Sequence, residues 1–176
     1  IQYLLILTSS FCVASFFSLN VYTASSFEAK VWLSRLRFLG FAFITPAGIL
    51  FFSYILKRWT WLQNKWVSAL IFLPGISTAL ITLNLFDQNL LVHSHAPYEY
   101  LGVSVLAFKN GPWFFVHYLW TNLLTALVMI MFIHSAIVDP PKRKHVFILS
   151  IGVIIGCIID FSSVAVNSSV RWLMLS

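Results

Sequence analysis

The stretch VWLSRLRFLGFAFITPAGILFFSYILK, residues 31–57, decides the fold class. It contains no Asp or Glu, and it is longer than the roughly 20 mostly apolar residues that a helix needs to cross a bilayer. Strands of a membrane barrel would be about half as long and would alternate between apolar and polar residues. The stretch therefore predicts a membrane-spanning helix.

Further apolar runs flank this one at residues 1–22, 66–86, 113–138 and 146–166, and a sixth begins at residue 170. Over the whole chain 60% of residues are hydrophobic and 9% are charged, whereas a soluble domain has about 25% charged residues. We therefore predict an all-α fold, a polytopic membrane helical bundle that occupies residues 1–176 as one domain. Because the chain begins with Ile1 and not Met, we expect it to be a piece of a longer protein.

The links between these runs predict how the chain crosses the membrane. Six of the eleven Lys and Arg residues fall in two short links: Lys57, Arg58, Lys65, Lys142, Arg143 and Lys144. Basic residues in short links mark the cytoplasmic side, so links 58–65 and 139–145 are predicted to be cytoplasmic. The long link 87–112 then lies outside, where its alternating pattern and turn residues predict a cap with a short hairpin. This charge distribution indicates a lipid bilayer as the partner and argues against nucleic acid.

Charged residues within the spans are informative because each costs roughly 2.5–3.5 kcal/mol near the bilayer centre. Arg35 and Arg37 point about 200° apart on a helix, so we expect one of them to face the bundle. Asp160 shares a helix face with Gly152 and Gly156, whose spacing lets another helix approach closely. At the matching depth, Asp160 is predicted to form a buried ion pair with Arg35 or Arg37. A structural role and a binding role for this pair both stay open.

Polar residues also gather where the long external link meets its two spans. In the third span these are Ser77, Asn84 and Gln88, with Asp87 at its end, and in the fourth span they are His117, Thr121 and Thr125, with Trp113 one turn above. Two polar stripes at the same depth predict either a binding pocket or interhelical hydrogen bonds. The candidate ligand-binding residues are Arg35, Asn84, Asp87, Trp113, His117, Thr121 and Asp160. No catalytic or metal-binding motif occurs in the sequence.

Three motifs along the chain together resemble a known family. The first is an aromatic residue, Arg-Leu and a mid-helix proline: Trp32, Arg35, Leu36 and Pro46. The second follows at the end of the next span: Asn84 and His93. The third opens the span after the long link: Gly111, Trp113, Phe114 and His117, with Trp120 at its last aromatic position. In this order they resemble the N-terminal seven-transmembrane sensor region of bacterial histidine kinases, over about residues 1–170.

The resemblance implies that the chain begins in the second of seven helices, so that about six of seven spans are visible. It implies a membrane sensor for an extracellular or membrane-dissolved small molecule, without enzyme activity or a cofactor in this segment. The signal would pass to a cytoplasmic output module on the same chain, a histidine kinase or a diguanylate cyclase. The resemblance also implies a homodimer in the bacterial inner membrane.

A redox subunit that holds haem or quinone is the alternative, because five histidines lie in an apolar chain. Two of them, His117 and His134, share one predicted helix. They are 17 residues apart, or about 25 Å along a helix, so they cannot ligate one haem together. We therefore favour the sensor interpretation, and a visible absorption spectrum would distinguish the two.

Overall fold

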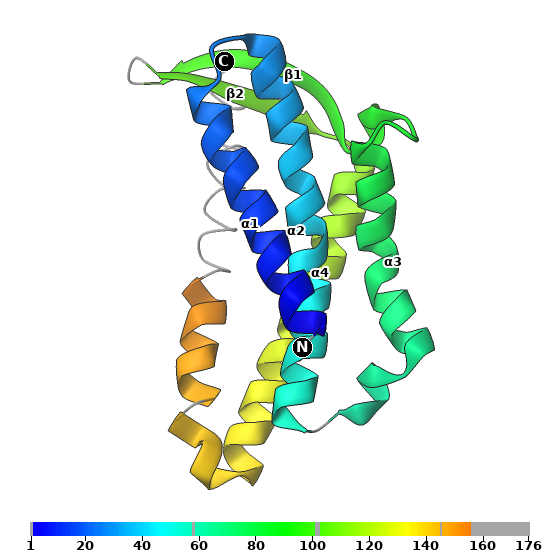
Figure 1. Ribbon diagram of the computed structural model, residues 1–176, viewed down its shortest axis with the longest axis vertical. Helices are drawn as coiled ribbons and strands as arrows, with labels where there is room; N and C mark the ends of the chain where they lie inside the picture. Colours follow the sequence, from blue (N-terminus) through cyan, green and yellow to red (C-terminus); the bar gives the residue numbers. More distant parts are fainter. Residues whose placement is uncertain (1, 58, 101–102, 145, 156–176) are drawn as a thin grey trace. The chain divides into compact units, whose positions relative to one another are not determined.

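The computed structural model describes residues 2–57, 59–100, 103–144 and 146–155 (Figure 1). Its elements are α1 (Gln2–Thr23), α2 (Phe27–Leu56), η1 (Thr60–Gln63), α3 (Lys65–Thr82), η2 (Gln88–Leu90), β1 (Val92–Tyr100), β2 (Val103–Asn110), α4 (Pro112–Val138) and η3 (Pro140–Lys142). A shorter apolar helix spans Val146–Ile155.

Within this described part, the four helices α1 to α4 are long and apolar enough to cross a membrane. They confirm the first four predicted spans, and the hairpin in the long link is confirmed by β1 and β2. The end of the fifth predicted span, the sixth apolar run and Asp160 lie outside the described residues.

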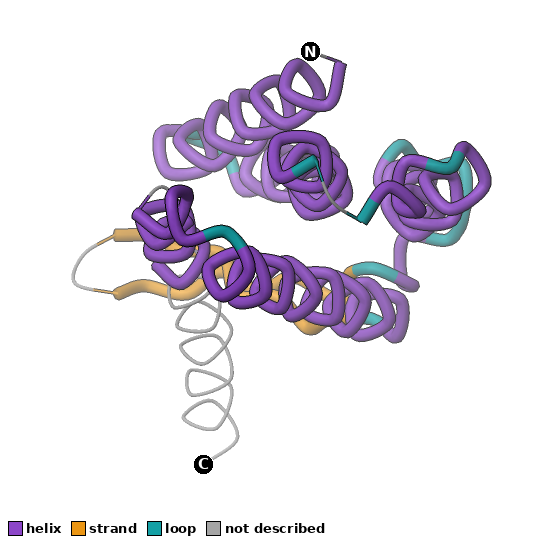
Figure 2. Tube along the Cα trace, turned by 90° about the horizontal axis from the view of Figure 1, so that it is seen from below, coloured by secondary structure: helices purple, strands orange, loops and turns teal. Residues whose placement is uncertain are grey.

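The chain divides into two compact units, one up to Leu124 and one from Thr125 onward. In the first unit, α2 packs against α1 on one side and against α3 on the other (Figure 1 and Figure 2). Among the described residues, the second unit contains the second half of α4, η3 and the helix Val146–Ile155. In it, Arg143 Nε donates a hydrogen bond to the carbonyl oxygen of Ala136 at 3.2 Å.

Two glycines bring the helices of the first unit close together. A Cβ added at Gly40 of α2 would meet the backbone nitrogen of Ala14 and, at 2.5 Å, the carbonyl oxygen of Ser10 in α1. A Cβ added at Gly75 of α3 would lie 2.5 Å from the carbonyl oxygen of Ala42 in α2. Small residues allow such backbone contact between membrane helices, where van der Waals packing drives association.

The helix α3 ends earlier than the sequence pattern predicts, at Thr82 and not at residue 86. The amide of Leu85 donates to the carbonyl of Leu80, and the amide of Asn84 donates to that of Ile81, both at 3.0 Å. Asn84 itself has a left-handed backbone conformation, with φ at 64°. These features form a Schellman motif, in which Asn replaces the more common glycine. The hydrogen-bonding geometry of the helix end therefore overrides the hydropathy of residues 83–86.

The hairpin leaves and rejoins the helices at almost the same point. Its strands pair antiparallel from Val92 with Asn110 at the base to Tyr100 with Val103 near the tip. Just below the base, the amide of Gly111 donates to the carbonyl oxygen of Leu91 at 2.9 Å. A Cβ at Gly111 would collide with the carbonyl oxygens of Asn89 and Leu90, so only glycine fits between the hairpin and α4 without a shift of the backbone.

Candidate functional site

The hydroxyl group of Thr78 joins α3 to α4. It lies 3.0 Å from Nδ1 of His117, and it accepts a hydrogen bond from Nε1 of Trp113, also at 3.0 Å. Its own proton goes to the carbonyl oxygen of Pro74, one turn earlier in α3, at 2.8 Å. Thr78 is fully buried and His117 is 8% exposed, so these bonds are shielded from solvent. We call these four residues the Thr78 cluster.

The Thr78 cluster also determines which ring nitrogen of His117 carries the proton. A hydroxyl group has one proton to donate and two lone pairs that accept. Thr78 gives its proton to the Pro74 carbonyl, which can only accept, and one lone pair is taken by the Trp113 indole. Nδ1 of His117 must therefore donate to the second lone pair. The neutral ring then has Nε2 as an acceptor, and the Thr78 hydroxyl is fully satisfied.

A third ring of α4 contacts α3 one turn below the cluster. Trp120 Nε1 donates to the carbonyl oxygen of Ile71 at 3.3 Å. Trp113, His117 and Trp120 share one helix face, at positions i, i+4 and i+7. Pro74 has no amide proton, so it cannot donate to the carbonyl of Leu70 in the preceding turn of α3. On this face of α4, Trp120 donates to the turn before Pro74, whereas Trp113 and His117 bond the Thr78 hydroxyl one turn after it.

An apolar cluster covers the end of α3 beneath the hairpin. Its buried members are Phe38, Ile81, Leu91 and Val92, with Trp113 and Phe114 packed against them. The rings of Phe38 and Phe114 meet edge to face, with their centroids 6.3 Å apart. This cluster brings α2, α3, the base of the hairpin and the start of α4 together next to the Thr78 cluster.

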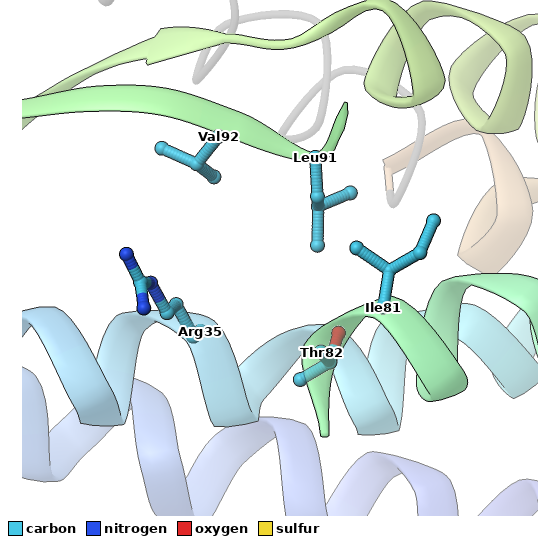
Figure 3. Close-up of a pocket in the computed structure, with 5 residues that line it drawn as sticks. All are labelled: Arg35, Ile81, Thr82, Leu91 and Val92. Atoms are coloured by element: carbon cyan, nitrogen blue, oxygen red, sulfur yellow. The ribbon is translucent and has the colours of Figure 1, made fainter. Parts of the chain in front are cut away.

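A small cavity opens beside this apolar cluster, with Arg35 on one wall (Figure 3). The guanidinium group rises from α2 toward Val92, and Leu91 and Ile81 point toward one another across the space. Thr82 completes the lining. The cavity measures about 10 Å³, which is room for about one water molecule. Arg35 is thus the arginine that meets this cavity, while the Arg37 guanidinium lies 5.6 Å from the ring of Phe38.

The structure brings together three of the seven predicted site residues at this end of the first unit: Arg35, Trp113 and His117. Thr121 lies on α4, where its hydroxyl donates to the carbonyl of Tyr118 at 2.9 Å. Asp87 is exposed, and its side chain accepts from the amide of Asn89 at 2.9 Å, shaping the turn into η2. Asn84 is exposed at the end of α3, and Asp160 lies outside the described residues.

Thr78 and Thr82 are the residues that the sequence analysis missed. Ser77 is predicted to belong to the polar stripe of the third span, but its hydroxyl donates to the carbonyl of Leu73 within α3. Thr82 is 2% exposed and bonds the carbonyl of Thr78. Thr78, Thr82 and the buried Ile71, Gly75 and Ile81 share one side of α3. This spacing of three and four residues is the sequence pattern that indicates a buried helix face containing Thr78 and Thr82.

The arrangement is suited to binding and to helix movement. Among the residues that the structure describes, no group of three His, Cys, Asp or Glu side chains is placed to hold a metal ion. A partly buried cation, Arg35, lies beside the small apolar cavity, next to a satisfied polar cluster between two helices.

Comparison with known protein families gives a match over nearly the whole chain. The model of a protein family described as the N-terminal 7TM region of histidine kinase matches residues 1–172. No curated protein and no solved structure matches the chain. The family match agrees with the resemblance stated from the sequence motifs, and it spans nearly the whole chain.

Proposed function

Because this chain belongs to the family of N-terminal seven-transmembrane regions of histidine kinases, and is thus a multi-pass membrane sensor region, we propose that it detects a small molecule at the end of the bundle beneath the hairpin. The ligand is extracellular or dissolved in the outer leaflet. It binds at the Arg35 cavity and alters the Thr78 cluster. The observation that carries this proposal is the Thr78 cluster, a buried polar contact between two spans right beside the cavity.

A route leads from the cavity to the cluster through the backbone. The cavity is too small for a metabolite, so a ligand enters only if Leu91 and Val92 move. The carbonyl of Leu91 accepts the amide of Gly111, the residue before α4 begins. A displaced Leu91 therefore pulls on the first turn of α4, which contains Trp113. From there α4 continues as one helix to Val138.

The free energy of the interhelical bonds at Thr78 is in the range that a ligand-driven change between two helix arrangements requires. Interhelical hydrogen bonds in membrane proteins contribute about 0.6 kcal/mol each on average, so the two bonds from Trp113 and His117 to the Thr78 hydroxyl amount to about 1.2 kcal/mol. Couplings between a ligand site and a distant site are typically about 1–3 kcal/mol. The cluster is therefore strong enough to favour one helix arrangement, and weak enough for a ligand that prefers the other arrangement to break it.

The signal passes from the outside of the membrane to the cytoplasm. Links 58–65 and 139–145 lie in the cytoplasm, and the cap 87–112 lies outside. The output module follows on the same chain, in a homodimer in the bacterial cytoplasmic membrane. The family match supports a kinase as this module, and a diguanylate cyclase is the alternative.

The test uses the full-length protein in membrane vesicles and measures basal autophosphorylation without any added ligand. Thr78→Val removes the hydroxyl at nearly constant shape, and we expect basal activity to change on the order of tenfold, the equivalent of about 1.4 kcal/mol. Thr78→Ser keeps the hydroxyl and should retain basal activity near that of the wild type.

Ser77→Ala is the matched control, because the neighbouring hydroxyl bonds within its own helix. If Thr78→Val and Ser77→Ala leave basal activity equally unchanged, the Thr78 cluster has no part in signalling. Formation of cyclic diguanylate in place of autophosphorylation would identify the alternative output module, with the same expected pattern among the variants.

A further inference from the structure

The link between α2 and α3 combines features that a merely connecting loop does not need. The ten residues KRWTWLQNKW, 57–66, contain three tryptophans, three basic residues and no acidic residue. The other basic link, DPPKRKH at 139–145, contains an aspartate and no tryptophan. Basic charge alone accounts for topology in both links, so the tryptophans of link 57–66 call for a separate explanation.

The described part of this link, residues 57 and 59–66, has a defined backbone fold. Lys57 and Trp59 both have left-handed conformations, with φ at 50° and 60°. Between the helices, Leu62 of η1 is 1% exposed, and its carbonyl accepts a hydrogen bond from the Ser68 hydroxyl at 3.0 Å. The side chain of Asn64 caps α3 by accepting from the amide of Trp66 at 3.0 Å. The link is therefore anchored from within by a buried leucine and two local hydrogen bonds.

Two indole rings stay on the outside of this anchored link. Trp61 is 52% exposed and Trp66 is 75% exposed. The ammonium group of Lys65 lies 5.5 Å from the centre of the Trp66 ring, and Lys57 is exposed at the end of α2. Since the link joins the ends of two membrane-spanning helices, these groups lie at the level of the lipid headgroups. Indole rings prefer this interfacial layer, and anionic lipids attract basic groups beside it.

We propose that the link Lys57–Trp66 is a binding site for the headgroup of an anionic phospholipid. Lys57 and Lys65 attract its phosphate, and the rings of Trp61 and Trp66 lie in the interfacial layer beside the glycerol region. The charge of the link and the absence of acidic residues from it favour an anionic over a zwitterionic lipid. This site lies at the opposite ends of α2 and α3 from the Arg35 cavity, and it does not depend on the proposed sensing function.

The test compares lipids by tryptophan quenching. The full chain is reconstituted in phosphatidylcholine vesicles that contain either brominated phosphatidylglycerol or brominated phosphatidylcholine at equal mole fractions. The signal of Trp61 and Trp66 is obtained by subtracting the spectrum of the Trp61→Phe/Trp66→Phe variant. We expect a preference for phosphatidylglycerol on the order of tenfold in the wild type, which falls to near one in Lys57→Gln/Lys65→Gln.

Lys109→Gln is the matched control, since Lys109 is an exposed lysine on the hairpin strand β2. It should keep the wild-type preference. A preference that survives in Lys57→Gln/Lys65→Gln, or one that Lys109→Gln lowers equally, overturns the proposal. Loss of the wild-type preference on addition of inorganic phosphate would assign the link to a soluble anion, and it too would overturn the proposed lipid site.

Discussion

The contact between α1 and α2 and the contact between α3 and α4 join neighbouring helices by different means. At Gly40, α2 lies against the backbone of α1 because a side chain is missing. At Thr78, α3 is joined to α4 because side chains supply matching donors and acceptors. The first contact tolerates no added atoms, whereas the second depends on a few polar atoms whose partners can be exchanged. The first is therefore suited to hold the bundle, and the second to respond.

The largest loss of stability is expected when the close contact between α1 and α2 at Gly40 is broken. Gly40→Ala places a methyl group against the backbone of Ala14 and Ser10, so the two helices must separate. We expect a loss of about 2–3 kcal/mol in the free energy of unfolding, measured by denaturant titration in micelles. Gly48→Ala is the control in the same helix, because its Cβ would meet nothing closer than 4.0 Å. Equal losses for both variants would mean that the close approach at Gly40 does not stabilise the bundle.

Removing the Thr78 hydroxyl from the contact between α3 and α4 should lower the free energy of unfolding by less. Thr78→Val leaves the Trp113 indole and the Nδ1 proton of His117 without their buried acceptor. We expect the free energy of unfolding to fall by about 2 kcal/mol. Adding Trp113→Phe to Thr78→Val should then cost less than Trp113→Phe costs alone, and a double-mutant cycle measures this coupling. Strictly additive losses would contradict the shared hydrogen bond.

The smallest loss of stability is expected at Trp120, on the face of α4 that also carries Trp113 and His117. Trp120→Phe removes a single hydrogen bond to the carbonyl of Ile71, at 3.3 Å, and keeps most of the ring. The expected loss is about 0.6 kcal/mol, seen as a small drop in the unfolding midpoint. A loss as large as that of Thr78→Val would mean that the perturbed turn before Pro74, and not the Thr78 hydroxyl, is the main attachment of α4.

The sequence predicts the spans and the hairpin well, because each depends on local composition. The rotation of each helix is harder to predict. Ser77 and Thr78 are adjacent and both polar, and only the structure shows that Thr78 faces His117, 39 residues away in the chain. Asn84 is predicted to bind a ligand from its place in a polar stripe, and the structure shows in addition that its left-handed backbone ends α3. An αL asparagine after an apolar helix is a known stop signal, so this role was within reach of the sequence.

Because the amide of Gly111 bonds the carbonyl of Leu91, the hairpin begins and ends at the same place next to the helices. The chain departs and returns at one place, so strands of another length or composition can be inserted there without changing the distance between α3 and α4. Closing a longer loop costs only about 0.6 kcal/mol for each doubling of its length. The hairpin is thus a module that can diversify while the helices packed against its base stay the same. Such a connection allows proteins of this family to differ in the hairpin without rebuilding their membrane helices.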